Sequence, residues 1–287
     1  MNTDKKPTIA VLGTGLIGAP VALNLHKQGF KVHAWNRTAA KAKALVVDGV
    51  QAFDTPANAV QGADIIVTVL TDSESVQGVM QEAAPALKQG AIWVQLSTVG
   101  IEGIGTLAAL AERHGLVFYD APVQGTRQPA ELAQLIILAS GPVEQRAVVQ
   151  PVFDAIGKRT LWVSEQIGGS SRLKLALNNW AFALTHGLAE SIAIAKGLGI
   201  DPALVVDVVT GGPMDSGYFQ AKAAAILAEN YTASFSIANA VKDAQLVVDA
   251  AAQAGLQVGV AQASLRRFER VQEAGHGDKD MAASYLA

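Results

Sequence analysis

Lys174 and Asn178 are the two polar residues whose types and spacing best suit catalysis. They lie four positions apart in a proline-free segment from Ser170 to Lys196, so one face of a helix would carry both side chains. The residues around Lys174 are mostly apolar, and burial among apolar residues lowers the pKa of a lysine. Such a lysine suits general acid–base chemistry on an alcohol or a carbonyl group. The alternative is a lysine whose ammonium group reaches solvent along a buried helix.

The glycine-rich segment Gly13-Thr14-Gly15-Leu16-Ile17-Gly18 is a second candidate site, because it follows an expected strand and opens an expected helix. In this context Gly13 permits a tight turn, Gly15 lets the backbone approach a pyrophosphate, and Gly18 lets helix and strand pack closely. The free N–H groups at the start of the helix attract phosphates. The segment therefore predicts a dinucleotide site, and the alternative is an ordinary glycine-rich turn.

The second expected strand ends at Asn36-Arg37-Thr38, where a dinucleotide site selects its cofactor. An NAD site usually has Asp or Glu here to bind the ribose 2′-hydroxyl, and these three positions carry no carboxylate. Arg37 can instead pair with a 2′-phosphate through its forked donors. The segment predicts NADP(H), with NAD(H) as the weaker alternative. The competing interpretation is that Arg37 is only a solvated loop charge.

The composition of the 287-residue chain narrows the classes of protein to which it can belong. Hydrophobic residues make up 50% and charged residues 16%, and the formal net charge is −3, so we expect a packed globular protein without a nucleic-acid partner. There is no cysteine, and no two of the five histidines have the spacing of a helical zinc site, so we expect no metal. No signal peptide and no apolar stretch of about 20 uncharged residues is visible, which predicts no membrane partner and a cytoplasmic location.

The elements that must position these residues divide the chain into two parts. Strand-like and helical runs alternate in the first part, which is typical of βαβ units and a mostly parallel sheet. The expected strands are 8–12, 31–35, 50–53, 64–70, 91–96, 116–121, 134–140 and 160–163. After these, helices are expected over 170–196, from Asp201-Pro202 onward, and over 216–228, 236–254 and 260–273. The predicted fold is an α/β Rossmann-like, doubly wound domain (1–164) followed by an all-α domain (165–287).

Five motifs are spaced along the chain. They are the glycine-rich segment with residues 36–38; Asp120-Ala121-Pro122-Val123-Gln124-Gly125-Thr126; the helix start with Lys174 and Asn178; Phe235 with Lys242-Asp243; and residues 275–280. These motifs resemble those of the β-hydroxyacid dehydrogenases, or 3-hydroxyisobutyrate dehydrogenase-like enzymes, and look most similar to the glyoxylate and succinic semialdehyde reductases among them. The second motif is similar to DAPVSGG or DAPVSGS, the third to GxxGxGxxxKxxxN and the fifth to GxGxxD. The imine reductases resemble the same family.

The resemblance implies a role for each matched position. Lys174 would exchange a proton with the carbonyl oxygen, and Asn178 would hold the substrate beside it. Gln124, Gly125 and Thr126 would meet the substrate carboxylate, although Gln124 replaces the usual serine and Thr126 the commoner glycine, which leaves the substrate open. The residues expected to line the cofactor are Gly13, Gly15, Leu16, Ile17, Gly18, Asn36, Arg37, Thr38, Leu70, Thr71, Thr98, Phe235 and Lys242.

The predicted activity is hydride transfer between NADPH and a small carbonyl or hydroxy acid, such as a semialdehyde, glyoxylate or a 3-hydroxy acid. One alternative is an imine reductase, although those enzymes usually carry Asp or Tyr where Lys174 stands. Another is a non-catalytic cofactor-binding protein, whose relatives generally lack this lysine. The expected partners are a small-molecule substrate and further copies of the chain, since the resemblance implies a homodimer or tetramer assembled through the helical domain.

Overall fold

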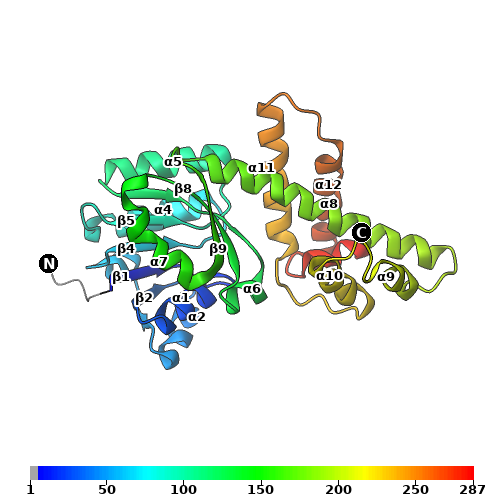
Figure 1. Ribbon diagram of the computed structural model, residues 1–287, viewed down its shortest axis with the longest axis horizontal. Coiled ribbons are helices and arrows are strands. Elements are labelled where there is room, and N and C mark those ends of the chain that lie inside the picture. The colour runs from blue at the N-terminus through cyan, green and yellow to red at the C-terminus, as the bar shows by residue number, and fades with distance from the viewer. Residues whose placement is uncertain (1–5) are drawn as a thin grey trace. The chain divides into compact units, whose positions relative to one another are not determined.

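The computed structural model describes residues 6–287, which divide into two compact units (Figure 1). The first unit ends at Lys174, and the second runs from Leu175 to Ala287. The division falls inside the long helix α8 (Gly169–Gly197), so the start of this helix belongs to the first unit.

The described part of the first unit contains one nine-stranded sheet with the order β3-β2-β1-β4-β5-β6-β8-β7, and β9 pairs with β8. Pairing is parallel from β3 through β6 and between β8 and β9, whereas β8 is antiparallel to β6 and β7. The mostly parallel sheet was therefore predicted correctly, apart from this antiparallel insertion. The strands are β1 (Thr8–Leu12), β2 (Lys31–Trp35), β3 (Gln51–Ala52), β4 (Ile65–Thr68), β5 (Ile92–Gln95), β6 (Val117–Asp120), β7 (Val123–Gln124), β8 (Leu135–Ser140) and β9 (Gly157–Ser164).

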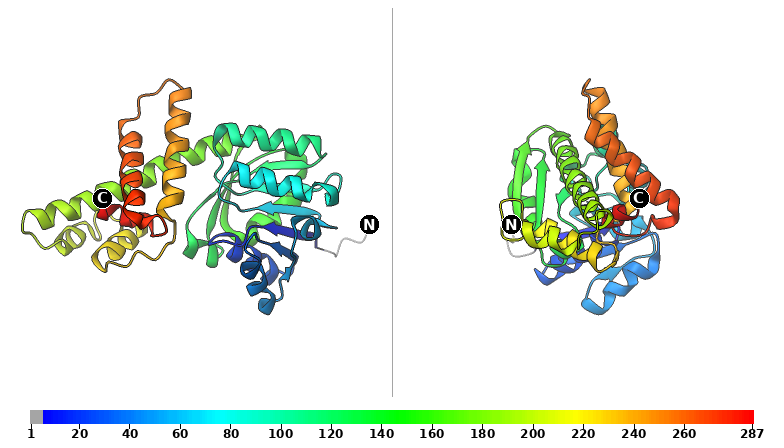
Figure 2. Two further views of the ribbon diagram at one scale, coloured as in Figure 1. Left: turned by 180° about the vertical axis from the view of Figure 1, so that it is seen from behind. Right: turned by 90° about the vertical axis from the view of Figure 1, so that its right-hand side faces the viewer.

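Helices cover both faces of this sheet because successive side chains of a strand point to opposite faces. In β1, Ile9 and Val11 pack with residues of α1 and α7, whereas Ala10 and Leu12 pack with residues of α3, α4 and α5. Figures 1 and 2 show α4 and α5 along one side of the sheet. The helices are α1 (Gly18–Lys27), α2 (Ala39–Lys43), α3 (Pro56–Val60), α4 (Ser73–Ala83), α5 (Gly100–Arg113), α6 (Arg127–Glu131) and α7 (Arg146–Ile156).

The second unit consists of helices around a core that includes Phe182, Ile237 and Phe268, and it confirms the expected helical half of the chain. Beside the remainder of α8 it contains α9 (Ala203–Val209), α10 (Gly217–Leu227), α11 (Ile237–Gln253) and α12 (Gly259–Val271). Figure 2 shows α11 and α12 side by side. In residues 6–287 no helix has the length and hydropathy needed to cross a bilayer.

The helix expected from Asp201-Pro202 onward is present. Pro202 has helical dihedral angles (φ −58°, ψ −26°) and directly precedes Ala203, the first residue of α9. The carboxylate of Asp201 accepts a hydrogen bond from the Ala203 N–H (2.9 Å), so the acidic side chain satisfies a free donor at the start of the helix.

Candidate active site

The glycine-rich loop lies between β1 and α1, and its three glycines face different surroundings. Gly13 has a φ of +106°, and a Cβ there would lie 2.2 Å from the Val69 carbonyl oxygen. A Cβ on Gly18 would lie 1.9 Å from the Gly13 carbonyl oxygen. Apart from its two neighbours in the chain, no residue has an atom within 4 Å of a Cβ built on Gly15. Protein packing therefore requires glycine at the first and last positions, whereas Gly15 borders open space that a phosphate could occupy.

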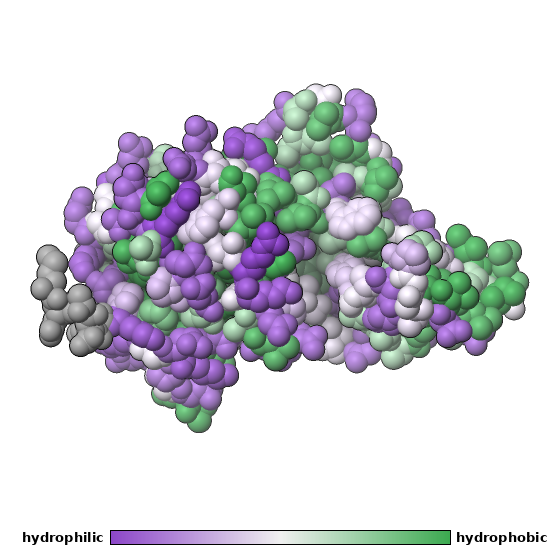
Figure 3. Space-filling model, in the orientation of Figure 1, coloured by the Kyte–Doolittle hydropathy of each residue, from purple (hydrophilic) through white to green (hydrophobic). Residues whose placement is uncertain are grey.

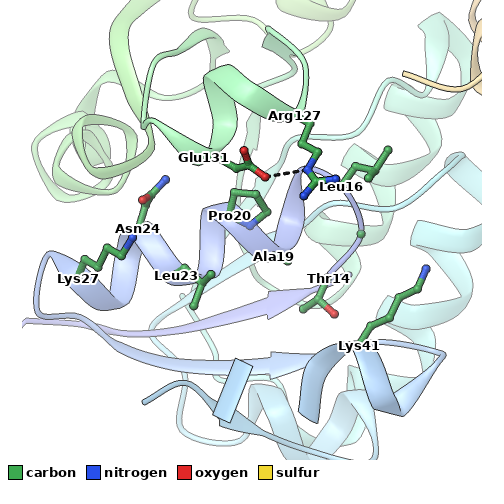
Figure 4. Close-up of a pocket in the computed structure, with 11 residues that line it drawn as sticks. Thr14, Leu16, Ala19, Pro20, Leu23, Asn24, Lys27, Lys41, Arg127 and Glu131 are labelled. Atoms are coloured by element: carbon green, nitrogen blue, oxygen red, sulfur yellow. Dashed lines mark hydrogen bonds and ion pairs between the residues drawn. The ribbon is translucent and has the colours of Figure 1, made fainter. Parts of the chain in front are cut away.

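A cavity of about 450 Å³ adjoins this loop (Figure 4). Lys41 of α2 and Arg127 of α6 line it from different elements, and Arg127 forms an ion pair with Glu131 (2.7 Å). The sequence predictions missed all three cations of the lining, Lys27, Lys41 and Arg127, although Lys41 follows Arg37-Thr38 by about one helical turn. The full lining is Thr14, Gly15, Leu16, Ala19, Pro20, Leu23, Asn24, Lys27, Lys41, Arg127 and Glu131.

The segment expected to select the cofactor lies next to the glycine-rich loop. Asn36 Oδ1 accepts a hydrogen bond from the Thr14 N–H (3.0 Å), and Asn36 Nδ2 donates to the Thr38 carbonyl oxygen (3.1 Å). Asn36 thus ties the ends of β1 and β2 together. Arg37 and Thr38 are exposed, so their side chains are available to a ligand.

The other residues predicted to line the cofactor in this unit follow parallel strands. Leu70 and Thr71 follow β4, Thr98 follows β5, and Leu16 and Ile17 lie between β1 and α1. The Leu70 N–H donates to Ser97 Oγ (2.8 Å), which joins the ends of β4 and β5. Carboxyl ends of parallel strands meet at one edge of a sheet, where ligands of doubly wound folds bind.

Lys174 has its side chain next to the segment that follows β6. It is 8% exposed, and its Nζ donates a hydrogen bond to Gln124 Oε1 (3.0 Å). Gln124 ends β7, Gly125 has a φ of +130°, and Thr126 is the N-cap of α6. The structure therefore brings the predicted proton-transfer residue together with the first residue predicted to meet the substrate.

A buried polar group lies one turn before Lys174, at the start of α8. Asp120 Oδ2 accepts from the N–H groups of Gly168 (3.1 Å) and Ser171 (2.9 Å), and Oδ1 accepts from Ser171 Oγ (2.8 Å). Ser140 Oγ accepts from the Ser170 N–H (3.0 Å) and lies 2.7 Å from Ser170 Oγ. We call Asp120, Ser140, Gly168, Ser170 and Ser171 the helix-start cluster.

Asp120 has an unusual ionisation equilibrium for an aspartate. Burial raises the pKa of its carboxyl group to about 6, although the hydrogen bonds from Ser171 and Gly168 and the charge of Arg172 lower it. The sequence motif contained Asp120, but its role was not predicted, because its partners lie about 50 residues away in the chain.

The remaining predicted residues belong to the second unit. Asn178 Nδ2 donates to Asp243 Oδ2 (2.9 Å), and Lys242 Nζ lies 2.6 Å from Asp243 Oδ1. Phe235 is half-buried, and its N–H donates to Asp280 Oδ2 (3.2 Å). Asp243, which belongs to the Lys242-Asp243 motif but was given no role of its own, is thus a buried partner of Asn178 and Lys242.

Known proteins share both parts of this layout. Residues 8–164 match the family described as the NAD binding domain of 6-phosphogluconate dehydrogenase, and residues 168–287 match the family described as NAD-binding of NADP-dependent 3-hydroxyisobutyrate dehydrogenase. The uncharacterized oxidoreductase YfjR of Bacillus subtilis (strain 168) is 30% identical over 283 residues, which cover 96% of this chain and 97% of that protein. Glyoxylate/succinic semialdehyde reductase 1 of Arabidopsis thaliana is 28% identical over 278 residues, which cover 96% of each chain.

Solved structures share the fold. 3-Hydroxyisobutyrate dehydrogenase from Salmonella typhimurium superposes with a TM-score of 0.91 over 98% of this chain and 99% of that chain, at 24% identity. An imine reductase from Pseudomonas sp. gives a TM-score of 0.64 over 98% of this chain and 99% of that chain, at 22% identity. The resemblance inferred from the five motifs is confirmed: the chain belongs to the β-hydroxyacid dehydrogenase family, whose members are NAD(P)-dependent oxidoreductases that act on hydroxyl or carbonyl groups.

Proposed function

We propose that this enzyme transfers a hydride between NADPH and a small carbonyl acid, or the corresponding hydroxy acid, with Lys174 as the general acid and base. The observation that carries the proposal is the buried Lys174, whose Nζ lies 3.0 Å from Gln124 Oε1 at the edge of the sheet where ligands of this fold bind. The name of the Arabidopsis relative includes glyoxylate and succinic semialdehyde, and both are small carbonyl acids, which supports this substrate class.

Different residues of the chain have different roles in the proposed reaction. Lys174 donates a proton to the carbonyl oxygen during reduction and accepts it in the reverse direction. Gln124, Gly125 and Thr126 bind the acid group, and Asn178, oriented by Asp243, holds the substrate beside Lys174. The bound nicotinamide supplies or receives the hydride. In this assignment residues 1–164 bind the cofactor and residues 165–287 serve substrate binding and dimerisation.

The preference for NADPH rests on cations around the glycine-rich loop. The open space at Gly15 and the adjoining cavity fit a dinucleotide phosphate. Arg37 is exposed at the end of β2, and Lys41 lines the cavity, so both can pair with a 2′-phosphate. Arg127, on another element, can contact the remaining cofactor phosphates. The other residues proposed to bind the cofactor are Leu70, Thr71, Thr98, Phe235 and Lys242.

An imine reductase is the second candidate function. One observation favours it, because Lys174 Nζ donates to the neutral side-chain amide of Gln124, and this amide adds no second cation that would attract an acid. An imine substrate would require a proton donor at the same place, which Lys174 can supply. The two functions differ in the substrate that is turned over.

We also propose a homodimer, or a tetramer built from it, formed through the second unit. No residue of α9 is buried, although most of its residues are apolar, and Val208 is 80% exposed. Leu198, near the end of α8, is 75% exposed. Figure 3 shows hydrophobic side chains gathered over α9 and the adjoining end of α8. Such a helix normally buries its apolar face against another surface, and a second copy of this chain is the proposed occupant.

Light scattering tests this assembly. Val208→Asp and Leu198→Asp should each convert the dimer to a monomer at micromolar concentration, since each buries a charge in the interface. Val47→Asp is the matched control, because Val47 is 88% exposed in the first unit. A wild-type protein that is already monomeric contradicts the proposal.

The reaction is tested by NADPH oxidation with succinic semialdehyde, glyoxylate and a cyclic imine. Lys174→Ala should lower the rate with the carbonyl acids by roughly 10²–10⁴-fold, because a positioned general acid is lost. Lys158→Ala, which removes an exposed lysine of β9, is the control and should keep the wild-type rate. Turnover of the imine alone would establish the second candidate, and tight NADPH binding without any oxidation would indicate a non-catalytic protein.

A further inference from the structure

The helix-start cluster joins two strand ends to the first turn of the helix that carries Lys174. Asp120 is the last residue of β6, and Ser140 is the last residue of β8. Their side chains accept hydrogen bonds from three main-chain N–H groups, those of Gly168, Ser170 and Ser171. The first N–H groups of a helix have no partner within the helix. Here they are satisfied by residues that lie 30 to 51 positions earlier in the chain.

These contacts form one of two links between the same segments. Asp120 holds Ser171, and Gln124, four residues later, holds Lys174, three residues after Ser171. A single polar contact constrains the rotation of the helix start about the helix axis less than two contacts do. Two links at neighbouring positions, together with the bonds of Ser140, fix both the rotation and the axial position of the first turn. Lys174 Nζ is thereby held in one place relative to Gln124.

The chemistry of the cluster argues against a purely structural cap. Asp120 is fully buried, and its three hydrogen-bond donors are neutral. Burying a carboxyl group among neutral donors is unfavourable when the group is ionised. A serine at the helix start satisfies the same kind of donor without this cost, as Ser216 does for α10. The serine cap is local, however, and cannot tie a helix to a distant strand.

We infer that Asp120 is a positioning residue for Lys174, which sets the place of the proton donor by holding the start of α8 against the end of β6. This inference rests on the proposed role of Lys174. It assigns to Asp120 no contact with the substrate or the cofactor. Asp120 acts through the position of the lysine alone, so its effect on catalysis should vanish when Lys174 is absent.

Two substitutions separate the geometry of Asp120 from its charge. In Asp120→Asn the amide oxygen can accept from both N–H groups, and the amide nitrogen can donate to Ser171 Oγ, so all three contacts survive. Asp120→Ala removes all three. We expect Asp120→Ala to lower kcat on the order of 10²-fold, as a displacement of about 1 Å does, and Asp120→Asn to stay within about tenfold of the wild type. The Kd for NADPH should not change in either variant.

The deciding experiment combines Asp120→Ala with Lys174→Ala. If Asp120 acts through Lys174, the double variant should be no more than about threefold slower than Lys174→Ala alone. An equal loss in both backgrounds, or a weaker NADPH affinity, would overturn the inference, because Asp120 would then act on the fold or the cofactor site. If Asp120→Ala does not fold, Ser171→Ala takes its place, since it removes one contact, and the same non-additivity with Lys174→Ala is required.

Amide hydrogen exchange gives a second readout that does not depend on turnover. The N–H groups of Gly168 and Ser171, which donate to Asp120, should exchange faster in Asp120→Ala than in the wild type and in Asp120→Asn. Equal exchange in all three proteins would overturn the inference even if the enzyme is active. A wild-type protein that oxidises no NADPH with any carbonyl compound, yet shows the expected exchange pattern, would refute the proposed function and leave the link between Asp120 and α8 intact.

Discussion

Two buried carboxylates, one in each unit, show opposite shifts. Asp120 is surrounded by neutral donors, and burial raises its pKa to about 6. Burial also acts upward on the pKa of Asp280, but the Lys222 ammonium (2.6 Å) and hydrogen bonds from Lys222, Ser234 and Ala282 outweigh it and lower this pKa below its usual value. The comparison teaches that burial does not decide the charge of an acid; the charge of its partners does. Asp280 is fixed as an anion, whereas Asp120 can change its protonation state near neutral pH.

The largest effect should follow from removing Lys222, the cation that forms an ion pair with Asp280. Lys222→Ala leaves the Asp280 carboxylate buried without its ammonium partner, and the free energy of unfolding should fall by about 3–5 kcal/mol. Urea denaturation followed by circular dichroism measures this loss. Lys196→Ala, at an exposed position of α8, should change stability by no more than about 0.5 kcal/mol. A small loss in Lys222→Ala would mean that Asp280 accepts a proton as readily as Asp120.

Arg37 is an exposed cation and differs from the buried Lys222, since we expect it to contribute to ligand binding and not to stability. Arg37→Ser should leave the unfolding transition unchanged and raise the KM for NADPH by about 10–100-fold, which corresponds to about 1.4–2.8 kcal/mol. The KM for NADH should stay the same, because NADH has no 2′-phosphate. Steady-state kinetics with both cofactors measure the difference. A parallel loss with NADH would contradict the assignment of Arg37 to the 2′-phosphate.

The pH dependence of the free energy of unfolding tests Asp120, the carboxyl group whose protonation state can change near neutral pH. Because the pKa of Asp120 in the folded protein lies above its ordinary value of 3.8, this group stabilises the folded state fully below pH 3.8 and loses that contribution as the pH rises through 6. The wild type should therefore gain about 1.4 kcal/mol relative to Asp120→Asn between pH 7.5 and pH 5. Asp280, with its lowered pKa, contributes above its ordinary pKa and loses its contribution only at lower pH. A difference that stays constant over this range would show that Asp120 is ionised throughout.

The smallest effect concerns a helix start that is capped locally. Ser216 Oγ accepts from the Phe219 N–H (3.1 Å) at the start of α10. Ser216→Ala should cost about 1 kcal/mol of stability and leave the kinetics unchanged. Thermal unfolding and the NADPH assay together measure both. A lower kcat in Ser216→Ala would show that a local helix cap also affects catalysis, and would contradict the distinction between such a cap and the positioning role inferred for Asp120.

The sequence alone could predict the parts of this fold that depend on local pattern. Apolar runs such as Ile65–Thr68 indicated buried strands, and the glycine-rich segment indicated the turn between β1 and α1. Lys174 and Asn178 were placed on one helix by their spacing. The antiparallel insertion of β7 and β8 was not predicted, because the direction in which a strand pairs depends on the path of the chain and not on the pattern within the strand.

The contacts that define the candidate site also depend on the path of the chain, so they could not be predicted from the sequence. Gln124 and Lys174 are 50 residues apart, and Asp120 and Ser171 are 51 residues apart. No periodicity relates such positions, because their meeting depends on the order of strands β5, β6 and β8 in the sheet. Arg127 was missed because its place beside the glycine-rich loop depends on where α6 packs.

The three glycines of the glycine-rich loop should tolerate substitution to different degrees in a population of variants. Gly13 and Gly18 have no room for a side chain, so substitutions there should reduce the abundance of the protein in a cell. Gly15 has room, so the chain with alanine at this position should accumulate normally and fail only in cofactor binding. In descendants of this protein that no longer bind a cofactor, we therefore expect substitutions at Gly15 first. Gly13 and Gly18 should remain glycine as long as the fold is kept.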